Sequence, residues 1–396
     1  MELLKSKTMV NLGIEELIAA PPAALKGKRL GLLCNQASTD RYFRHSRDLI
    51  AHAFPGQLSC LLTPQHGFFC EKQDNMIESD HSRDPQTGLP VFSLYGETRR
   101  PTAQMFDHLD VLLVDLIDVG TRVYTFMSTL AYCLEEAARS GKKVVVLDRP
   151  NPVDGVHIEG NLVDEGLRSF VGLYPVPMRH GLTFGELGLL FNDHFGINAD
   201  YQVISMKGWK RHMTFAETGL PWLFPSPNMP TAATAAVYPG QVIWEGTNIS
   251  EGRGTSLPFE LFGAPFLHQQ QIVKFLDHSL LSGCFLRPLM FQPTANKWAG
   301  DNCQGFQLHV TDHLSFRPYR VSLALLQAFM KLYPADFAFK SPPYEYEFEK
   351  MPIDLILGSQ KVRKALTDGV EILDLEESWQ DDLRQFNDAR QKYFLY

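Results

Sequence analysis

Five short apolar runs within the first 150 residues constrain the fold of this chain more than any other feature. They cover residues 29–35, 58–64, 89–95, 111–117 and 142–148. Polar residues hardly interrupt them, as in strands that are buried on both faces of a parallel sheet. A helical pattern at 123–141 separates the last two runs and ends at Gly141. Since strands and helices alternate, we predict a doubly wound α/β domain.

The 396-residue chain is longer than one hydrophobic core usually serves, which predicts two domains. A further strand is expected at 201–209, and the proline-rich, aromatic stretch 219–241 is expected to form a long ordered loop. The rest of the chain mixes strand and helix patterns, at 305–312, 317–333 and 380–394. We therefore predict a first domain at 1–210 and a smaller α+β domain at 211–396.

Charge and cysteine content exclude several classes of function. The net charge is −8 and no run of Lys and Arg stands out, which argues against a nucleic-acid groove or an anionic membrane surface as partner. The six cysteines include no CxxC pair, which is typical of free thiols in a reducing compartment. We see no signal peptide pattern and no membrane-spanning run, so we expect a cytoplasmic protein.

The motifs that bind common cofactors are absent from the sequence. No GxGxxG follows the first strand, and neither GxxxxGK[ST] nor HExxH occurs. The GxSxG sequence of serine hydrolases is missing as well. We therefore expect no nucleotide, no metal and no other cofactor.

Polar residues follow the apolar runs at the places where strands of the predicted sheet end. In an open parallel sheet, ligands bind outside the carboxyl ends of the strands. We therefore expect these loops to line one site, although ordinary turns are polar as well. The residues concerned include Asn35, Gln65, His66, Tyr95, Glu97, Asp115, Asp118, Arg122 and Asn151. His66 suits proton transfer or the orientation of a carboxylate, and a hydrogen-bonded turn histidine is the alternative.

The stretch "EGTNISEGRGT" brings two carboxylates and an arginine into a glycine-rich segment. Glu245 ends the run "QVIWE", for which we predict a strand, and Glu251 and Arg253 lie in the loop behind it. Paired carboxylates suit glycoside hydrolysis, in which one of them needs a raised pKa to act as general acid. Alternatively, Glu245 is a structural partner at the strand end. We favour that role for Glu245 and a functional one for Glu251.

Several long motifs together resemble one known family. They are "GLLCNQAS", "LLTPQHGF", "TGLPVFSLYGETRRPT", "DVLLVDLIDVGTRVYTF", "VVVLDRPNPVDG", "GLYPVPMRHGLTFGELG", "FPSPNMPT" and "EGTNISEGRGTSLPFELFGAP". In this order they resemble the bacterial NamZ-like exo-β-N-acetylmuramidases. The resemblance implies a Rossmann-like domain, a smaller auxiliary α/β domain and an active-site cleft between them. It implies release of terminal N-acetylmuramic acid from the non-reducing ends of peptidoglycan fragments, without metal or nucleotide.

One position departs from this family. Relatives typically read "PEHG" and use that glutamate as a proposed catalytic residue, whereas this chain has Gln65 in "PQHG". An amide exchanges hydrogen bonds, but it neither delivers nor takes a proton near neutral pH. Either another carboxylate such as Glu97 or Asp115 takes the role, or the chain is a catalytically impaired protein that binds muropeptides or amino sugars.

The leading hypothesis from the sequence is an exo-acting glycosidase. Its candidate catalytic residues are Glu251, Glu97, Glu245 and His66. Its candidate substrate-binding residues are Asn35, Gln65, Tyr95, Asp115, Asp118, Arg122, Tyr124, Asn151, Asn228 and Arg253. Among these, Arg253 or Arg122 is expected to meet the lactyl carboxylate of muramic acid, because a guanidinium pairs well with a carboxylate. The expected partners are glycosides of N-acetylmuramic acid.

Overall fold

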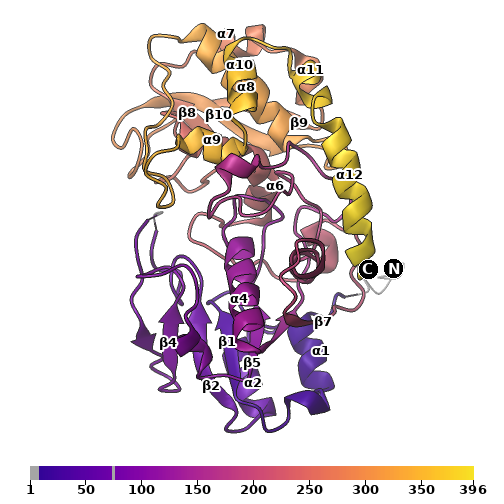
Figure 1. The fold of residues 1–396 in the computed structure, drawn as a ribbon. Coiled ribbons are helices and arrows are strands. Elements are labelled where there is room, and N and C mark those ends of the chain that lie inside the picture. The colour runs from indigo at the N-terminus through magenta and orange to yellow at the C-terminus, as the bar shows by residue number, and fades with distance from the viewer. Residues whose placement is uncertain (1–8, 74–75) are drawn as a thin grey trace, which may run out of the picture.

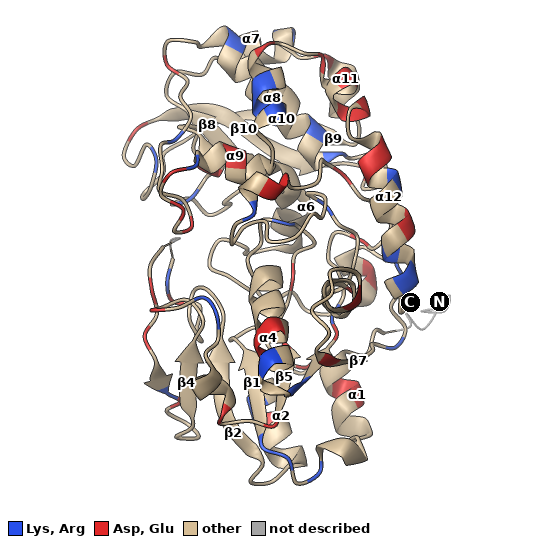
Figure 2. Cartoon of the chain, viewed as in Figure 1, with Lys and Arg blue, Asp and Glu red and all other residues tan. Residues whose placement is uncertain are grey.

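The computed structural model describes residues 9–73 and 76–396. Figure 1 shows a lower half, built on a wide sheet, and an upper half that holds most of the C-terminal helices. Both charge signs are spread over the two halves (Figure 2). Within the described residues, no helix has the length and apolar character needed to cross a membrane.

The lower half contains a seven-stranded sheet. Its strands are β1 (Leu30–Cys34), β2 (Leu58–Thr63), β3 (Ser82–Arg83), β4 (Pro90–Ser93), β5 (Val111–Asp115), β6 (Lys143–Leu147) and β7 (Asp200–Ile204). They are ordered β3-β4-β2-β1-β5-β6-β7, and all neighbours are parallel except β3 and β4. Without β3, this is the strand order of the Rossmann fold, with the topological switch between β1 and β5. The predicted α/β domain is confirmed.

Helices cover both faces of this sheet. The helices are α1 (Gly13–Ala19) and α2 (Ser46–Ala53) on one face, and α3 (Ala103–Phe106), α4 (Phe126–Ser140) and α5 (Phe184–Leu189) on the other. Successive strand residues point to opposite faces, so Leu32 packs toward α1 and α2 while Leu33 packs toward α4. Burial on both faces explains why the strand sequences are apolar throughout.

The upper half is built on the antiparallel sheet β8-β10-β9 and several helices. Its elements are α6 (Ala232–Gln241), β8 (Leu261–Ala264), α7 (Gln269–Phe275), β9 (Cys284–Phe291), β10 (Cys303–Val310), α8 (Pro318–Leu332), α9 (Pro352–Leu357), α10 (Gln360–Thr367), α11 (Ile372–Glu377) and α12 (Gln380–Arg390). Short helical turns complete the described chain: η1 (Ala23–Leu25), η2 (Glu165–Leu167), η3 (Leu190–His194), η4 (Phe215–Thr218), η5 (Val242–Gly246), η6 (His278–Leu281) and η7 (Gln391–Tyr393). The boundary at residue 210 stays a prediction, with one sheet on each side of it.

Two local predictions are wrong. The stretch 219–241 is irregular only at its start, because its alanine-rich second part forms α6, which Thr231 caps by accepting a hydrogen bond from the backbone N–H of Thr234. The run "QVIWE" is no strand: η5 continues directly from α6. A short apolar run does not distinguish a buried strand from a buried helical turn.

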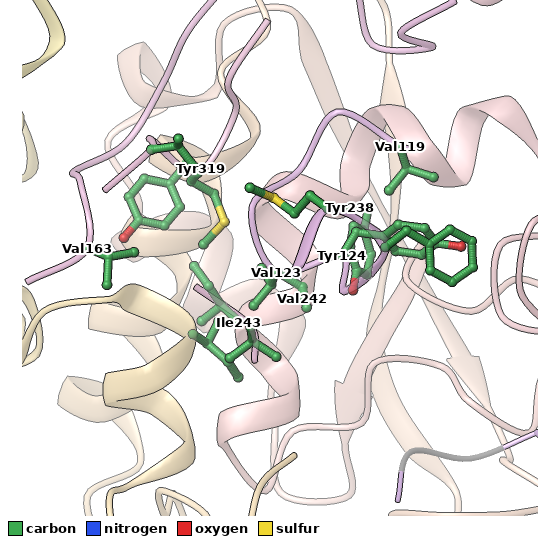
Figure 3. Packing of buried hydrophobic residues seen from close by; sticks show 14 of the residues in the cluster. Val119, Val123, Tyr124, Val163, Tyr238, Val242, Ile243 and Tyr319 are labelled. Atoms are coloured by element: carbon green, nitrogen blue, oxygen red, sulfur yellow. The ribbon is translucent and has the colours of Figure 1, made fainter. Parts of the chain in front are cut away.

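The two halves share a continuous apolar core. Figure 3 shows part of it, with Val119, Val123 and Tyr124 of the lower half near Tyr238 and Val242 of the upper half. The terminal helix α12 also runs beside both halves (Figure 1), and its last residue, Arg390, donates hydrogen bonds to backbone carbonyls of the lower half. These contacts hold the halves in one relative position.

Candidate active site

A cavity of about 450 Å³ lies between the two halves, beyond the carboxyl ends of the parallel strands. Its walls are Gln65, His66, Val123, Tyr124, Thr125, Phe126, Val171, Ser226, Asn228, Met229, Tyr238, Glu245, Arg253, Phe259, Tyr344 and Glu345. The lower half supplies the first seven of these residues, and the last six belong to α6 and the chain beyond it.

His66 lies just behind β2 and is held in an unusual backbone conformation. Its φ of 76° is in the left-handed region. Its Nδ1 is 2.7 Å from the carbonyl oxygen of Lys72, and because a carbonyl only accepts, Nδ1 carries the proton. Burial lowers the pKa of His66 to about 4. At neutral pH the ring is therefore uncharged, and its Nε2 is a hydrogen-bond acceptor.

Gln65 belongs to a hydrogen-bond network that crosses the cavity. Its Oε1 accepts from the hydroxyl of Thr125 at 2.6 Å, which fixes the orientation of the amide. Its Nε2 donates to Glu345 Oε1 at 3.0 Å and to the hydroxyl of Tyr95 at 3.1 Å. Tyr95 in turn donates to Glu345 Oε2 at 2.6 Å. The group that faces Gln65 is therefore the carboxyl of Glu345.

Glu345 has the features of a proton donor near neutral pH. It lies between α8 and α9 with a φ of 47°, and only 7% of its surface is exposed. Burial raises the pKa of Glu345 to about 7, and the neighbouring Glu245 also raises it, whereas the hydrogen bonds from Tyr95 and Gln65 lower it. No cation forms an ion pair with its carboxyl group among the described residues.

Glu245 brings a second carboxylate to the same cavity. One of its oxygens pairs with Arg253 Nη2 at 2.6 Å, and the other accepts from the hydroxyl of Tyr344 at 2.6 Å. Arg253 is a permanent cation, so this pair stabilises negative charge on Glu245. The cavity therefore combines a carboxyl group that keeps its proton up to about neutral pH with a second carboxylate that is paired with an arginine.

Glu251 lies behind this cavity, outside its wall. Its oxygens pair with Lys297 Nζ at 2.7 Å and with Arg253 Nε at 3.1 Å. Burial raises the pKa of Glu251, but the charges of Lys297 and Arg253 outweigh burial, so that the pKa is lowered overall. This environment keeps Glu251 ionised and ties it to the arginine that holds Glu245.

Aromatic side chains form much of the remaining wall. Tyr238 meets Phe259 edge to face at 4.8 Å between ring centroids, and Tyr124 at 6.1 Å. Tyr124 also packs against Phe126 at 4.7 Å. Aromatic walls with a few convergent polar groups are common in small-molecule sites. Phe259, like His66 and Glu345, has a positive φ, and such strained residues cluster at functional sites.

Three predicted site residues, Asn35, Asp115 and Asn151, lie at or shortly after the carboxyl ends of β1, β5 and β6. Asn35 donates to the carbonyl of Pro225 at 2.9 Å, and Asn151 donates to that of Leu182 at 2.9 Å. Asp115 accepts from both Arg149 and Ser46. These side chains are buried in structural contacts, and none belongs to the cavity wall.

The other predicted residues divide between the cavity and its surroundings. Glu97 is exposed on a turn, and Asp118 accepts from the backbone N–H of Gly120 at 2.8 Å. Arg122 is fully buried and donates to the carbonyls of Asn161, Val176, Ile356 and Leu357. Asn228 lies at the cavity edge and donates to the carbonyl of Gln73 at 2.9 Å. Gln65, His66, Tyr124, Asn228, Glu245 and Arg253 are thus brought together in one wall.

The sequence analysis missed Glu345 and Tyr344. Both lie in the segment "PPYEYEFEK", which reads as a proline-rich connection. Its only signal is the alternation of tyrosine and glutamate directly behind two prolines. The contact to Gln65 spans 280 positions of the chain, and no sequence spacing indicates it.

Comparisons with known proteins agree with this architecture. Residues 30–233 match the model "Exo-beta-N-acetylmuramidase NamZ, N-terminal", and residues 236–396 match its C-terminal counterpart. The chain is 42% identical over 390 residues to the peptidoglycan beta-N-acetylmuramidase NamZ of Bacillus subtilis, covering 98% of this chain and 92% of that protein.

Two crystal structures of DUF1343 family proteins from Bacteroides fragilis are similar in fold. One has a TM-score of 0.88 at 33% identity and the other 0.75 at 27%, and each comparison covers 98% of this chain and 99% of the other. Within the described residues, no group of three or more His, Cys, Asp or Glu side chains is arranged to hold a metal ion. The resemblance seen in the sequence is confirmed: this chain belongs to the NamZ family of exo-β-N-acetylmuramidases.

Proposed function

We propose that the protein is an exo-β-N-acetylmuramidase, which releases terminal N-acetylmuramic acid from the non-reducing ends of peptidoglycan fragments. The observation that carries the proposal is the pair Glu345 and Glu245, two carboxyl groups of opposite character in one cavity. Glycosidases need this combination of an acid and an anionic carboxylate. The name of the Bacillus subtilis relative supports the same bond and the same sugar.

In this proposal Glu345 is the general acid. Its proton passes to the glycosidic oxygen as the bond between that oxygen and C1 of the muramic acid breaks. Glu245 faces the positive charge that develops at C1, and it either attacks C1 or takes a proton from the attacking water. Water supplies the hydroxyl group that remains on the sugar and releases one proton. That proton goes directly to Glu345 where Glu245 has attacked C1, and it passes from Glu245 through solvent to Glu345 where Glu245 activated the water.

The neighbouring residues position these two groups. Gln65 and Tyr95 each hold one oxygen of Glu345. His66 offers Nε2 to a sugar hydroxyl, and the aromatic wall contacts the apolar face of the ring. Glu251 acts through Arg253, whose guanidinium it shares with Glu245. We therefore assign to Glu345 the catalytic role that the sequence analysis gave to Glu251.

The proposed partners are peptidoglycan-derived amino sugars, and the proposed compartment is the cytoplasm. All six cysteines lie in the described residues and are free thiols. Such thiols fit a reducing compartment, where imported cell-wall fragments would be the substrates.

The test is an activity assay on the wild-type protein. We expect release of N-acetylmuramic acid from its disaccharide with N-acetylglucosamine and turnover of a chromogenic β-N-acetylmuramide. The corresponding N-acetylglucosaminide, which lacks the lactyl group, is the control. Calorimetric binding of the muramide without any turnover would instead support the impaired, sugar-binding alternative.

A further inference from the structure

A second cavity opens beside the first one. It has an empty volume of about 720 Å³ and shares Glu245, Arg253 and Tyr344 with the reaction cavity. Because three residues line both spaces, the two cavities are direct neighbours. Several charged residues line this second cavity, whereas aromatic residues form much of the wall of the first one.

The second cavity carries an excess of positive charge. Among the described residues, its wall contains two carboxylates, Glu245 and Glu251, and three cations, Arg253, Lys297 and Lys340. The balance is one positive charge, in a chain whose net charge is −8. A concave surface with this local sign favours an anionic ligand group.

Lys340 is the cation that remains for a ligand. Lys297 is partly buried and donates to Glu251 and to the carbonyls of Trp244 and Ile249. Arg253 is held by Glu245 and Glu251. The ammonium group of Lys340, in contrast, is exposed and makes no hydrogen bond or ion pair with any described residue.

The backbone of Lys340 is nevertheless fixed next to the reaction cavity. Its N–H donates to the carbonyl of Gly246 at 2.9 Å, directly behind Glu245. Its neighbour Phe339 forms a β-bridge with Thr247. Lys340 therefore carries an exposed charge on a backbone that is fixed beside Glu245, and both residues line this cavity.

We propose that this second cavity binds a carboxylate group attached to the sugar, with Lys340 as its ion-pair partner. The inference rests on the proposed function. Muramic acid carries such a group on its lactyl ether, and in peptide-bearing fragments the carboxylates lie further out on the peptide. Arg122 is one of the two arginines that the sequence analysis proposed for the lactyl carboxylate. In the structure its guanidinium donates hydrogen bonds to four backbone carbonyls of the core instead.

The experiment compares Lys340→Met with wild type on three chromogenic β-N-acetylmuramides. The first has a free lactyl carboxylate, the second has its methyl ester, and the third has an amide-linked alanine that moves the carboxylate outward. Lys361→Met is the matched control, because Lys361 is exposed on α10 and lies outside this cavity. Thermal melts verify that each variant is folded.

We expect Lys340→Met to lower the ratio of kcat/KM for the free acid to kcat/KM for the ester by about fivefold, mainly through KM. A larger effect on the alanine-linked substrate would identify the peptide carboxylate as the partner, with the cavity still an anion subsite. An unchanged ratio for both carboxylate substrates would overturn the inference. Absence of turnover in wild type would instead contradict the proposed function, so the two failures are distinguishable.

Discussion

Glu251 and Glu345 are both buried carboxyl groups, with 2% and 7% of their surface exposed, yet their environments are opposite. Glu251 is paired with Lys297 and Arg253, and its pKa is lowered. Among the described residues, the hydrogen-bond donors to Glu345 are the neutral side chains of Tyr95 and Gln65, and burial raises its pKa to about 7 although Arg253 nearby lowers it. Burial raises the pKa of both, so the charge of the hydrogen-bond partners decides the outcome.

The difference teaches how to recognise the acid in such a site. The conspicuous glutamate of the glycine-rich loop, Glu251, forms ion pairs with two cations, and in the proposed mechanism it supports Arg253. The glutamate in an inconspicuous proline-rich connection has no cationic partner among the described residues and faces the cavity. A carboxyl group suited to donate a proton is one that the protein has buried without a compensating charge.

Removal of the proton donor gives the largest expected effect. Glu345→Gln keeps the size of the side chain but has no acidic proton, so we expect kcat on the disaccharide to fall about a thousandfold. Enzyme kinetics on the purified variant measures this. Glu349→Gln, an exposed change in the same segment, is the control and should retain wild-type activity. Wild-type rates in Glu345→Gln would remove Glu345 from the mechanism.

Removal of the carboxylate of Glu251 is expected to lower the stability of the fold. Glu251→Gln leaves Lys297 without its carboxylate partner and removes one of the two carboxylates paired with Arg253, which we expect to lower the free energy of unfolding by about 3 kcal/mol at pH 7. The lowered pKa of Glu251 means that its contribution is present above pH 4.5 and is lost as the pH falls further.

The contribution of Glu345 to stability should depend on pH in the opposite direction, which Glu345→Gln tests. Because the pKa of Glu345 is raised from 4.5 to about 7, its contribution to stability is present below pH 4.5 and is lost as the pH rises through 7. Denaturant unfolding of both variants and of wild type between about pH 2 and pH 8 compares the two. Equal losses at all pH values would mean that the two carboxyl groups do not differ as described.

The pH dependence of activity tests the contact between Tyr95 and Glu345. Tyr95→Phe removes a hydrogen bond that stabilises the ionised carboxylate, so the pKa of Glu345 rises further. We expect the alkaline limb of kcat/KM, near pH 7 in wild type, to move up by about one pH unit. Tyr132→Phe is the control, since Tyr132 lies in the same aromatic cluster without touching Glu345. An unmoved limb in Tyr95→Phe would contradict the assignment.

The smallest effect is expected at Gln65. Gln65→Glu places a second carboxyl group about 3 Å from Glu345, and the two would share one proton near neutral pH. Since Glu345 already supplies the proton, we expect activity at pH 6 within about tenfold of wild type. A gain from almost no activity to rapid turnover would show that catalysis needs a carboxylate at position 65.

Much of the fold could be predicted because burial leaves a direct trace in sequence. The apolar runs at 29–35 and 111–117 became β1 and β5, since strands covered on both faces carry few polar residues. The run "QVIWE" is similarly apolar, but its residues from Val242 onward belong to the helical turn η5. A buried helical turn is as apolar as a buried strand. Local composition therefore reports burial better than it reports the type of element.

The strand pattern predicted only those site residues that lie directly behind strands of the parallel sheet. Gln65 and His66 lie directly behind β2, as expected of ligand-binding loops in a parallel sheet. Asp115 is the last residue of β5, but its carboxylate is paired with Arg149 and does not line the cavity. Glu345 reaches the cavity from a segment 280 positions further along the chain, through packing between the two halves. Such a contact depends on tertiary structure and leaves no periodic signal.

The most direct test of the central claim compares leaving groups in Glu345→Gln. A dinitrophenolate departs without a proton, whereas the sugar hydroxyl of the disaccharide needs one. If Glu345 is the general acid, the variant loses about a thousandfold in kcat/KM on the disaccharide and less than about tenfold on the dinitrophenyl β-N-acetylmuramide. Equal losses on both substrates would contradict the account, because Glu345 would then act on binding or on C1 rather than on the departing oxygen.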